Sequence, residues 1–174
     1  MPAVAAEALT RWQAEQLRRP GIRIVPPDHL HVTLAFLGAR PATELDELVA
    51  VLQDAAASQR RPALEAERYR ETERVAMLVF TDEEGRAAAL QAGLSARLEL
   101  LGVYRPEARA WLPHVTVARF SARPRLGLAP PELGVVTPTE AALYRSTLAR
   151  TGATYEVLAS AQLARIGDGP GATP

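Results

Sequence analysis

The sequence predicts a mixed α and β protein that forms one domain or two small lobes sharing a core. Its 174 residues suit one such domain. Amphipathic helical segments alternate with short apolar, β-prone runs. A helix, a connection and a strand that begins with His-Val-Thr also occur twice in the same order. We therefore expect two similar halves, arranged so that the two His-Val-Thr strands meet at the bottom of a cleft.

The first half is predicted to begin with a helix. Residues 3–18 have helical periodicity, and Pro20-Gly21 ends the helix. The residues expected near its apolar face are Val4, Ala8, Leu9, Trp12 and Leu17. The elements expected next are a short strand at 22–25, a turn at 26–28, a strand at about 30–37 and a helix at about 41–58.

The second half repeats the order of helix and His-Val-Thr strand after two further strands. The expected elements are strands at about 64–69 and 75–80, a helix at about 84–101, a strand at 114–120, a Pro-, Gly- and Arg-rich loop at 121–134, and strands at 140–148 and 155–163. We expect residues 1–166 to form a single bilobal domain and residues 167–174 to form a flexible tail.

The residue types that are missing exclude several functional classes. The chain has no Cys, which excludes disulfides, a thiol nucleophile and a thiolate metal site. All 20 basic residues are Arg, and the lack of Lys excludes a P-loop, a Schiff-base lysine and a ligase that is adenylated on Lys. No apolar run approaches a membrane span, and no signal peptide is recognisable, so we expect a cytoplasmic protein.

The repeated tripeptide is the strongest functional signal. It occurs as His31-Val32-Thr33 and as His114-Val115-Thr116. Residues i and i+2 of a strand point to the same face, so each copy presents an imidazole beside a hydroxyl. Either pair alone is most simply a structural His and a packed Thr. Two pairs in matching contexts predict a site with one acid, one base and two hydroxyl donors, which suits proton transfer around a phosphate.

Three segments resemble a known family: PPDHLHVTLAFLG at 26–38, PHVTVARF at 113–120 and ALYRSTLARTGATYEVL at 142–158. They resemble the bacterial RNA 2′,3′-cyclic phosphodiesterases, also called the 2′-5′ RNA ligase family, of the two-histidine phosphoesterase superfamily. The resemblance covers nearly the whole chain. It implies an α+β fold with two pseudo-symmetric lobes of antiparallel sheet and outer helices around a central cleft.

The resemblance also implies an activity and residue roles. The activity is hydrolysis of RNA 2′,3′-cyclic phosphate ends to 2′-phosphomonoesters without metal or cofactor, and the reverse reaction is 2′-5′ ligation without ATP. His31 is implied as the acid and His114 as the base, although the sequence itself leaves their order open. Thr33, Thr116 and Arg119 are implied to bind the phosphate.

The position of Arg119 poses a geometric problem. It lies five residues after His114, so a regular strand would point it to the opposite face, and only a bulge or strong twist would bring it round. Phe36 has the same offset from His31 and is expected either to stack on a nucleobase or to pack in the core. Trp111 and Tyr144 are further candidates to line the cleft, with a core position as the alternative for Trp111.

The chain departs from the family pattern in three places. The apolar strand that usually opens these proteins is missing before the first helix. Leu112 occupies a position that is often basic, which puts one phosphate or ribose contact in doubt. His29 replaces a residue that is commonly Asn and would share a strand face with His31. Three His without an acidic cluster make a poor metal set, so we expect no metal.

Three other functions remain open at this point. The first is a two-histidine enzyme for a small cyclic phosphate, such as ADP-ribose cyclic phosphate or a cyclic nucleotide. The second is a non-catalytic module that binds RNA ends, and the third is a structural partner protein. The expected partners are RNA ends or small cyclic phosphates, with no membrane and no ATP, and the expected state is a monomer.

Overall fold

The computed structural model describes residues 1–149 and 152–164, which fall into two compact units. Unit 1 consists of Met1–Thr33, Ala63–Glu84 and Ala110–Thr137, and unit 2 consists of Leu34–Pro62, Gly85–Arg109 and the chain from Pro138 onward. The predicted α+β class with antiparallel sheets is confirmed. The single bilobal domain and the cleft stay predictions, and the expected tail at 167–174 lies outside the described residues.

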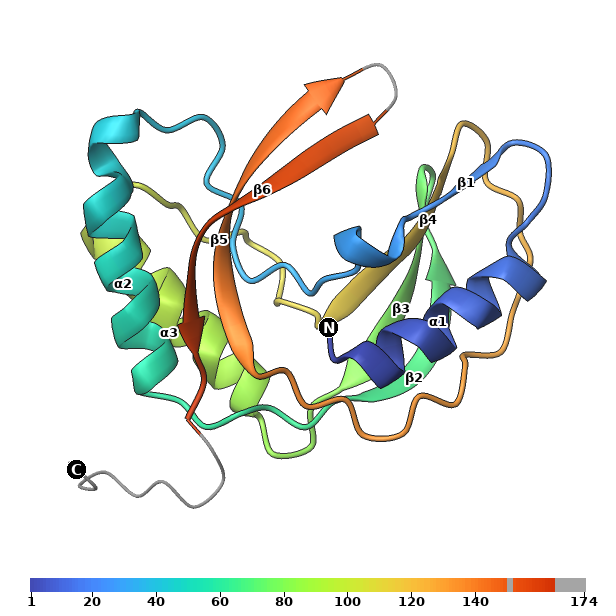
Figure 1. Ribbon diagram of the computed structural model, residues 1–174, viewed down its shortest axis with the longest axis horizontal. Coiled ribbons are helices and arrows are strands. Elements are labelled where there is room, and N and C mark those ends of the chain that lie inside the picture. Colours follow the sequence, from blue (N-terminus) through green and yellow to red (C-terminus); the bar gives the residue numbers. More distant parts are fainter. Residues whose placement is uncertain (150–151, 165–174) are drawn as a thin grey trace. The chain divides into compact units, whose positions relative to one another are not determined.

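Unit 1 is built on a four-stranded antiparallel sheet with the order β1-β4-β3-β2 (Figure 1). The strands are β1 (Ile22–Ile24), β2 (Glu65–Glu71), β3 (Val75–Thr81) and β4 (His114–Phe120). The two central strands are rich in β-branched and aromatic residues, and most of their side chains are buried. The edge strand β2 carries mostly charged residues, which protect the open edge from pairing with other chains.

Helix α1 (Ala3–Gln16) covers one face of this sheet (Figure 1). Of the residues predicted for its apolar face, Leu9 and Leu17 are buried and Ala8 and Trp12 are half-buried, but Val4 is not. Val4 is 80% exposed, whereas Ala5, Leu9 and Gln13 are buried. The Gln13 side-chain amide donates hydrogen bonds to the carbonyl oxygens of Val25 and Val117, at 3.1 and 2.8 Å. These two bonds satisfy backbone carbonyls beneath the helix, so a polar residue that the sequence did not assign to the buried face belongs to it.

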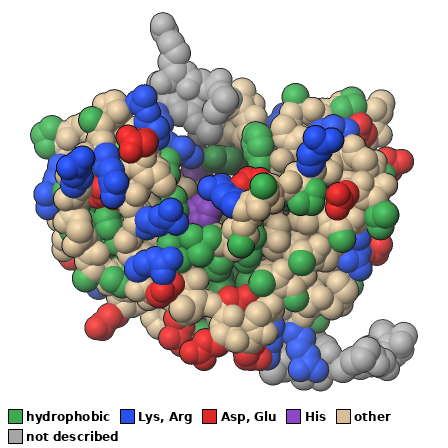
Figure 2. Space-filling model, turned by 180° about the vertical axis from the view of Figure 1, so that it is seen from behind, with side chains coloured by type: hydrophobic (Ala, Val, Ile, Leu, Met, Phe, Trp, Pro, Cys, Tyr) green, Lys and Arg blue, Asp and Glu red, His purple; other side chains and the backbone are tan. Residues whose placement is uncertain are grey.

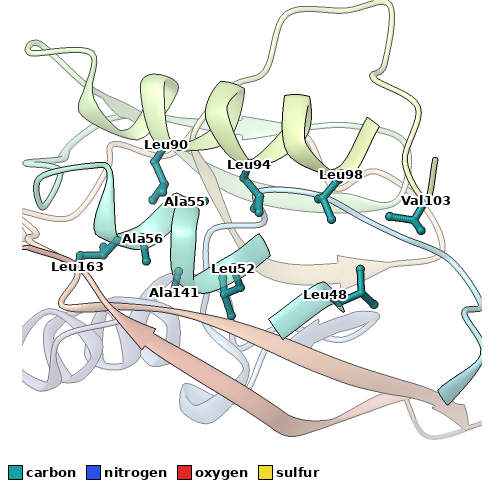
Figure 3. Packing of buried hydrophobic residues seen from close by; sticks show 10 residues of the cluster. All are labelled: Leu48, Leu52, Ala55, Ala56, Leu90, Leu94, Leu98, Val103, Ala141 and Leu163. Carbon is teal, nitrogen blue, oxygen red and sulfur yellow. The ribbon is translucent and has the colours of Figure 1, made fainter. Parts of the chain in front are cut away.

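Unit 2 consists of two helices and a long hairpin. The helices are α2 (Leu45–Ala57), which follows a short 3-10 turn at Ala42–Glu44, and α3 (Arg86–Leu100), and the hairpin is formed by β5 (Glu140–Ala149) and β6 (Gly152–Gln162). Figure 3 shows the core between them, where Leu side chains spaced four residues apart on each helix face one another and face Ala141 and Leu163 of the hairpin region. This spacing places one apolar stripe of each helix inside.

The predicted strand at 30–37 is wrong. In this segment only Val32 makes a bridge, which is antiparallel to Val115. Leu34, Ala35 and Leu37 instead pack against the helical core of unit 2, while Phe36 is 75% exposed. The apolar run therefore divides after Thr33, since its first part extends the sheet of unit 1 and its second part supplies the core of unit 2.

Among the described residues, the first element is α1, which begins at Ala3. No helix in this part of the chain is long and apolar enough to cross a membrane.

Candidate functional site

The chain leaves the sheet after β1 and rejoins it at Val32, which places the first His-Val-Thr tripeptide beside the second. Ile22–Ile24 pairs with residues 118–120 of β4, and the Val25 N–H donates to the Val117 carbonyl at 3.0 Å. The chain then leaves the sheet through a short 3-10 helix at Pro27–His29, which the two prolines at 26 and 27 favour. The side chain of Leu30 is buried and fixes this segment to unit 1, and Val32 rejoins the sheet opposite Val115.

The bridge between Val32 and Val115 sets the register of the four predicted site residues. In an antiparallel pair, the residues on either side of a bridge also face each other in reversed order. His31 therefore lies opposite Thr116, and Thr33 lies opposite His114. All four side chains point away from the face that buries Val115, so one surface of unit 1 carries two imidazoles and two hydroxyls. Figure 2 shows that histidine atoms reach the molecular surface.

A β-bulge resolves the geometric problem at Arg119. On β3, Thr116 is paired with Met77 and Arg119 with Val75, so Val117 is an extra residue in β4. Val75 and Met77 are two residues apart on β3 and share a face, and their partners Arg119 and Thr116 must share that face too. The bulge therefore places the exposed Arg119 side chain on the same surface as the two His-Thr pairs.

The two imidazoles are oriented in the same way. His31 Nδ1 lies 2.7 Å from the carbonyl oxygen of His29, and His114 Nδ1 lies 2.8 Å from that of Leu112. Because a carbonyl can only accept, each Nδ1 carries the proton in the bond, and Nε2 is left to exchange a proton with a ligand. The bond to His114 comes from the backbone carbonyl of Leu112 and does not depend on the side chain at that position. The expected loss of a phosphate or ribose contact at Leu112 stays a prediction.

Burial changes the pKa of His31. Burial disfavours the imidazolium and lowers the pKa of His31 below 6.5, and the positive charge of Arg119 acts in the same direction. The backbone hydrogen bond from Nδ1 opposes this shift but does not cancel it. The lowered pKa favours the neutral form of His31, in which Nε2 can accept a proton.

Trp111 supports the site through a hydrogen bond that the sequence did not predict. Its indole N–H donates to the Thr33 carbonyl at 3.0 Å and so ties the segment before His114 to the first tripeptide. The ring is half-buried, so the core position, which was the alternative for Trp111, is wrong. Trp111 holds the backbone of Thr33, and any contact with a ligand stays a prediction.

We expect Trp111→Phe to lower kcat/KM by roughly three- to tenfold, because the lost bond, worth about 1 kcal/mol, frees the Thr33 backbone. Steady-state assays on a phosphodiester substrate measure this. Trp12→Phe is the matched control, since Trp12 packs against Tyr69 at a ring-centroid distance of 5.9 Å on the helix-covered face. Equal losses in both variants would contradict the positioning role.

Two predicted cleft residues belong to unit 2. Phe36 is 75% exposed, so the core-packing alternative is wrong. Tyr144 on β5 is 42% exposed and packs edge-on against Tyr155 at a centroid distance of 6.2 Å. Both aromatic side chains are accessible, and stacking on a nucleobase stays a prediction for them.

Among the residues that the structure describes, His29 belongs to no metal-binding cluster. It lies 3.8 Å from the Asp28 carboxylate. Within residues 1–149 and 152–164, no group of three or more His, Cys, Asp or Glu side chains could hold a metal ion.

Sequence reasoning missed Gln13, which is almost fully buried at 1% exposure. Its amide bonds to the Val117 carbonyl within the bulge, and so helps to hold the conformation that turns Arg119 toward the site. Its only signal in the sequence is the four-residue spacing from Ala5 and Leu9. A polar residue at such a position is ordinarily read as solvent-exposed.

Comparison with known proteins agrees with this geometry. A family model described as LigT like Phosphoesterase matches residues 1–70. A curated protein of Thermus thermophilus named RNA 2′,3′-cyclic phosphodiesterase is 33% identical over 91% of this chain and 84% of its own length.

Solved structures show the same fold over nearly the full chain. A Thermus thermophilus protein with a crystal structure is 32% identical, with a TM-score of 0.77 over 94% of this chain and 93% of that one. E. coli LigT complexed with 3′-AMP is 26% identical, with a TM-score of 0.77 over 94% and 93%. The chain belongs to the LigT-like phosphoesterases of the two-histidine superfamily, and it is a phosphodiesterase.

Proposed function

We propose that this protein hydrolyses the 2′,3′-cyclic phosphate at RNA ends to a 2′-phosphomonoester, using no metal. The observation that carries this proposal is the pair of imidazoles on one surface, each with Nδ1 bound to a carbonyl and each opposite a threonine. Such a pair can supply both proton transfers that opening of a cyclic phosphate requires.

The reaction requires one base and one acid on opposite sides of the phosphorus. The neutral imidazole takes a proton from water through Nε2 as the water oxygen attacks phosphorus. The bond from phosphorus to the ribose 3′-oxygen breaks, and the protonated imidazole gives its proton to that oxygen. Thr33, Thr116 and Arg119 donate hydrogen bonds to the non-bridging oxygens, where negative charge builds up in the transition state.

The lowered pKa of His31 favours His31 as the base and His114 as the acid. This order is the reverse of the one that the family resemblance implied. When a 5′-hydroxyl replaces water as the nucleophile, the base takes the hydroxyl proton and the acid protonates the departing 3′-oxygen, so the same groups in the same roles support ATP-independent 2′-5′ joining.

The ligands of related structures are compatible with this chemistry. E. coli LigT has been solved with 3′-AMP and with NADP+. These compounds carry a 3′-phosphate and a 2′-phosphate on ribose, the two monoesters to which a 2′,3′-cyclic phosphate can open. Because both are small nucleotides, a small cyclic phosphate is the second candidate substrate.

Product analysis tests the proposal directly. An RNA oligonucleotide with a 2′,3′-cyclic phosphate end is incubated with the protein in EDTA, and the ends are identified by chromatography and by phosphatase sensitivity. We expect a 2′-phosphate end and an unchanged rate without EDTA. A strict requirement for a divalent metal, or a 3′-phosphate product, would overturn the proposal. Turnover of a nucleoside cyclic phosphate but not of the oligonucleotide would select the second candidate.

We expect kcat/KM to depend on pH as a bell with both limbs near neutrality. A base loses activity when it is protonated, so with His31 as the base the acidic limb should lie below pH 6.5. If His31 is instead the acid, its lowered pKa should make activity decline on the alkaline side from below pH 6.5. Rates measured from pH 4.5 to 9 at constant ionic strength distinguish these results.

A further inference from the structure

Two arginines face each other across the edge of the unit 1 sheet. Arg23 of β1 is the direct partner of Arg119 of β4, and both side chains are exposed. Directly opposite residues on antiparallel strands point to the same face, with Cβ atoms about 5 Å apart. An anion that lies between the two guanidinium groups is attracted by both and can accept hydrogen bonds from both.

This arginine pair lies on the same surface as the histidines. The bulge at Val117 turns Arg119 to the side of Thr116, and the direct pairing turns Arg23 to that side as well. Beside the pair is a hollow of about 390 Å³, lined by Gly21, Arg23, Arg119, Phe120 and Ser121.

The distance along β4 suits a second phosphate. Arg119 is three residues beyond Thr116, which corresponds to at most about 10 Å of strand, and the bulge shortens this distance. An RNA chain carries one phosphate per nucleotide, so the next anion beyond the cyclic phosphate is one nucleotide away. Guanidinium forks bind phosphate oxygens in pairs without reading the base.

We propose that Arg23 and Arg119 form a second anion subsite, which holds the phosphodiester on the 5′ side of the terminal nucleotide. This inference rests on the proposed function, because it places the cyclic phosphate at the two histidines. The subsite gives the enzyme a preference for ends of RNA chains over free nucleoside cyclic phosphates. Arg119 contacts both the cyclic phosphate and the 5′ phosphodiester, whereas Arg23 contacts the 5′ phosphodiester only.

The test compares two substrates that differ by one nucleotide, that is, by the 5′ phosphodiester and the nucleoside attached to it. They are a nucleoside 2′,3′-cyclic phosphate with a free 5′-hydroxyl, and the dinucleotide that ends in the same cyclic nucleoside. We expect the unaltered protein to prefer the dinucleotide and Arg23→Ala to reduce that ratio of kcat/KM values by roughly tenfold or more. The plot of log KM for the dinucleotide against log salt should lose about 0.7 of its slope, as for one phosphate contact on a single strand.

Arg11→Ala is the matched control, because Arg11 is an exposed arginine on α1 and lies apart from the site face. It should leave both the ratio and the salt slope unchanged. Arg23→Lys should keep the salt slope and recover part of the ratio, since it keeps the charge but not the fork. Thermal melting confirms that each variant is folded.

The following results would contradict the proposed subsite. Equal losses on both substrates would place Arg23 at the cyclic phosphate, and an unchanged ratio would exclude a contact with the second phosphate. An unaltered protein that turns over both substrates without preference would also exclude it. If the unaltered protein opens neither cyclic phosphate, the proposed function itself fails, and the subsite fails with it.

Discussion

Replacing either His31 or His114 with alanine should lower kcat on a 2′,3′-cyclic phosphate by about 10²- to 10⁴-fold, the usual contribution of a general acid or base. Each imidazole is oriented by its own carbonyl, so the loss of one does not displace the other. His29→Ala is the matched control, because it removes an imidazole from the same segment but keeps the backbone carbonyl that orients His31. A loss from His29→Ala as large as that from His31→Ala would contradict the assignment.

A substrate with an activated leaving group separates the acid from the base. A 3′-deoxynucleoside 2′-phosphodiester of 4-nitrophenol releases nitrophenolate, which needs no proton. The variant that lacks the acid should therefore regain most of its activity on this ester, and the variant that lacks the base should not. With His31 as the base, we expect His114→Ala to recover. Recovery of His31→Ala instead would restore the order that the family resemblance implied.

Glu71→Ala should have the largest effect on stability, because one buried carboxylate holds a whole loop in place. Glu71 is almost fully buried at the end of β2. It accepts hydrogen bonds from the backbone N–H groups of Arg125 and Leu126, both at 2.8 Å, and from the Tyr69 hydroxyl at 2.9 Å. The Nε of the Arg123 guanidinium also lies 3.3 Å from a carboxylate oxygen of Glu71.

We expect Glu71→Ala to reduce the free energy of unfolding by about 2–4 kcal/mol, since it leaves several buried donors without a partner. Arg125 adds to this cost, because its left-handed backbone, with φ of 56°, is held by the N–H bond to Glu71. Urea denaturation followed by circular dichroism measures the change. Glu67→Ala on the same strand removes a solvent-exposed carboxylate paired with Arg68 and should cost at most about 1 kcal/mol. Similar values for both variants would contradict the role of Glu71.

The same carboxylate predicts how stability depends on pH. Burial by itself raises the pKa of Glu71, but hydrogen bonds from Leu126, Tyr69, Arg125 and Arg123 together hold it below its ordinary value of 4.5. A lowered pKa in the folded state means that the stabilisation is complete above pH 4.5 and is lost as the pH falls through the folded value. Glu71→Gln should therefore flatten the decline of stability with acid, as measured by urea midpoints from pH 3 to 7.

The sequence predicted the helices, most of the strands and the two histidines, because these depend on local patterns. Periodicity of apolar residues is sufficient to place α2 and α3. The His-x-Thr spacing is likewise sufficient to put each imidazole beside a hydroxyl. The strand order and the pairing of Val32 with Val115 depend on contacts between distant segments, which periodicity does not encode.

The predictions that were wrong or missing also depend on contacts between distant segments. The run from His31 to Gly38 is apolar and β-prone, but most of it finds its partners in the helical core of unit 2 and not in a sheet. Arg119 could be placed on the correct face only with knowledge of the bulge at Val117, for which the sequence Val-Thr-Val-Ala-Arg gives no local sign. Gln13 was missed because its partners are backbone carbonyls that belong to other elements.

The interrupted edge of the unit 1 sheet affects how the protein loses activity on heating. β4 carries His114 in the middle of the sheet, whereas His31 is held on the edge by three residues of β1 and one bridge at Val32. Short edge segments open in local fluctuations at a much lower free-energy cost than a central strand. On heating, we therefore expect His31 to leave the site while the core is still folded. Amide hydrogen exchange should be faster at 22–33 than at 114–120, and activity should disappear at a lower temperature than the circular dichroism signal.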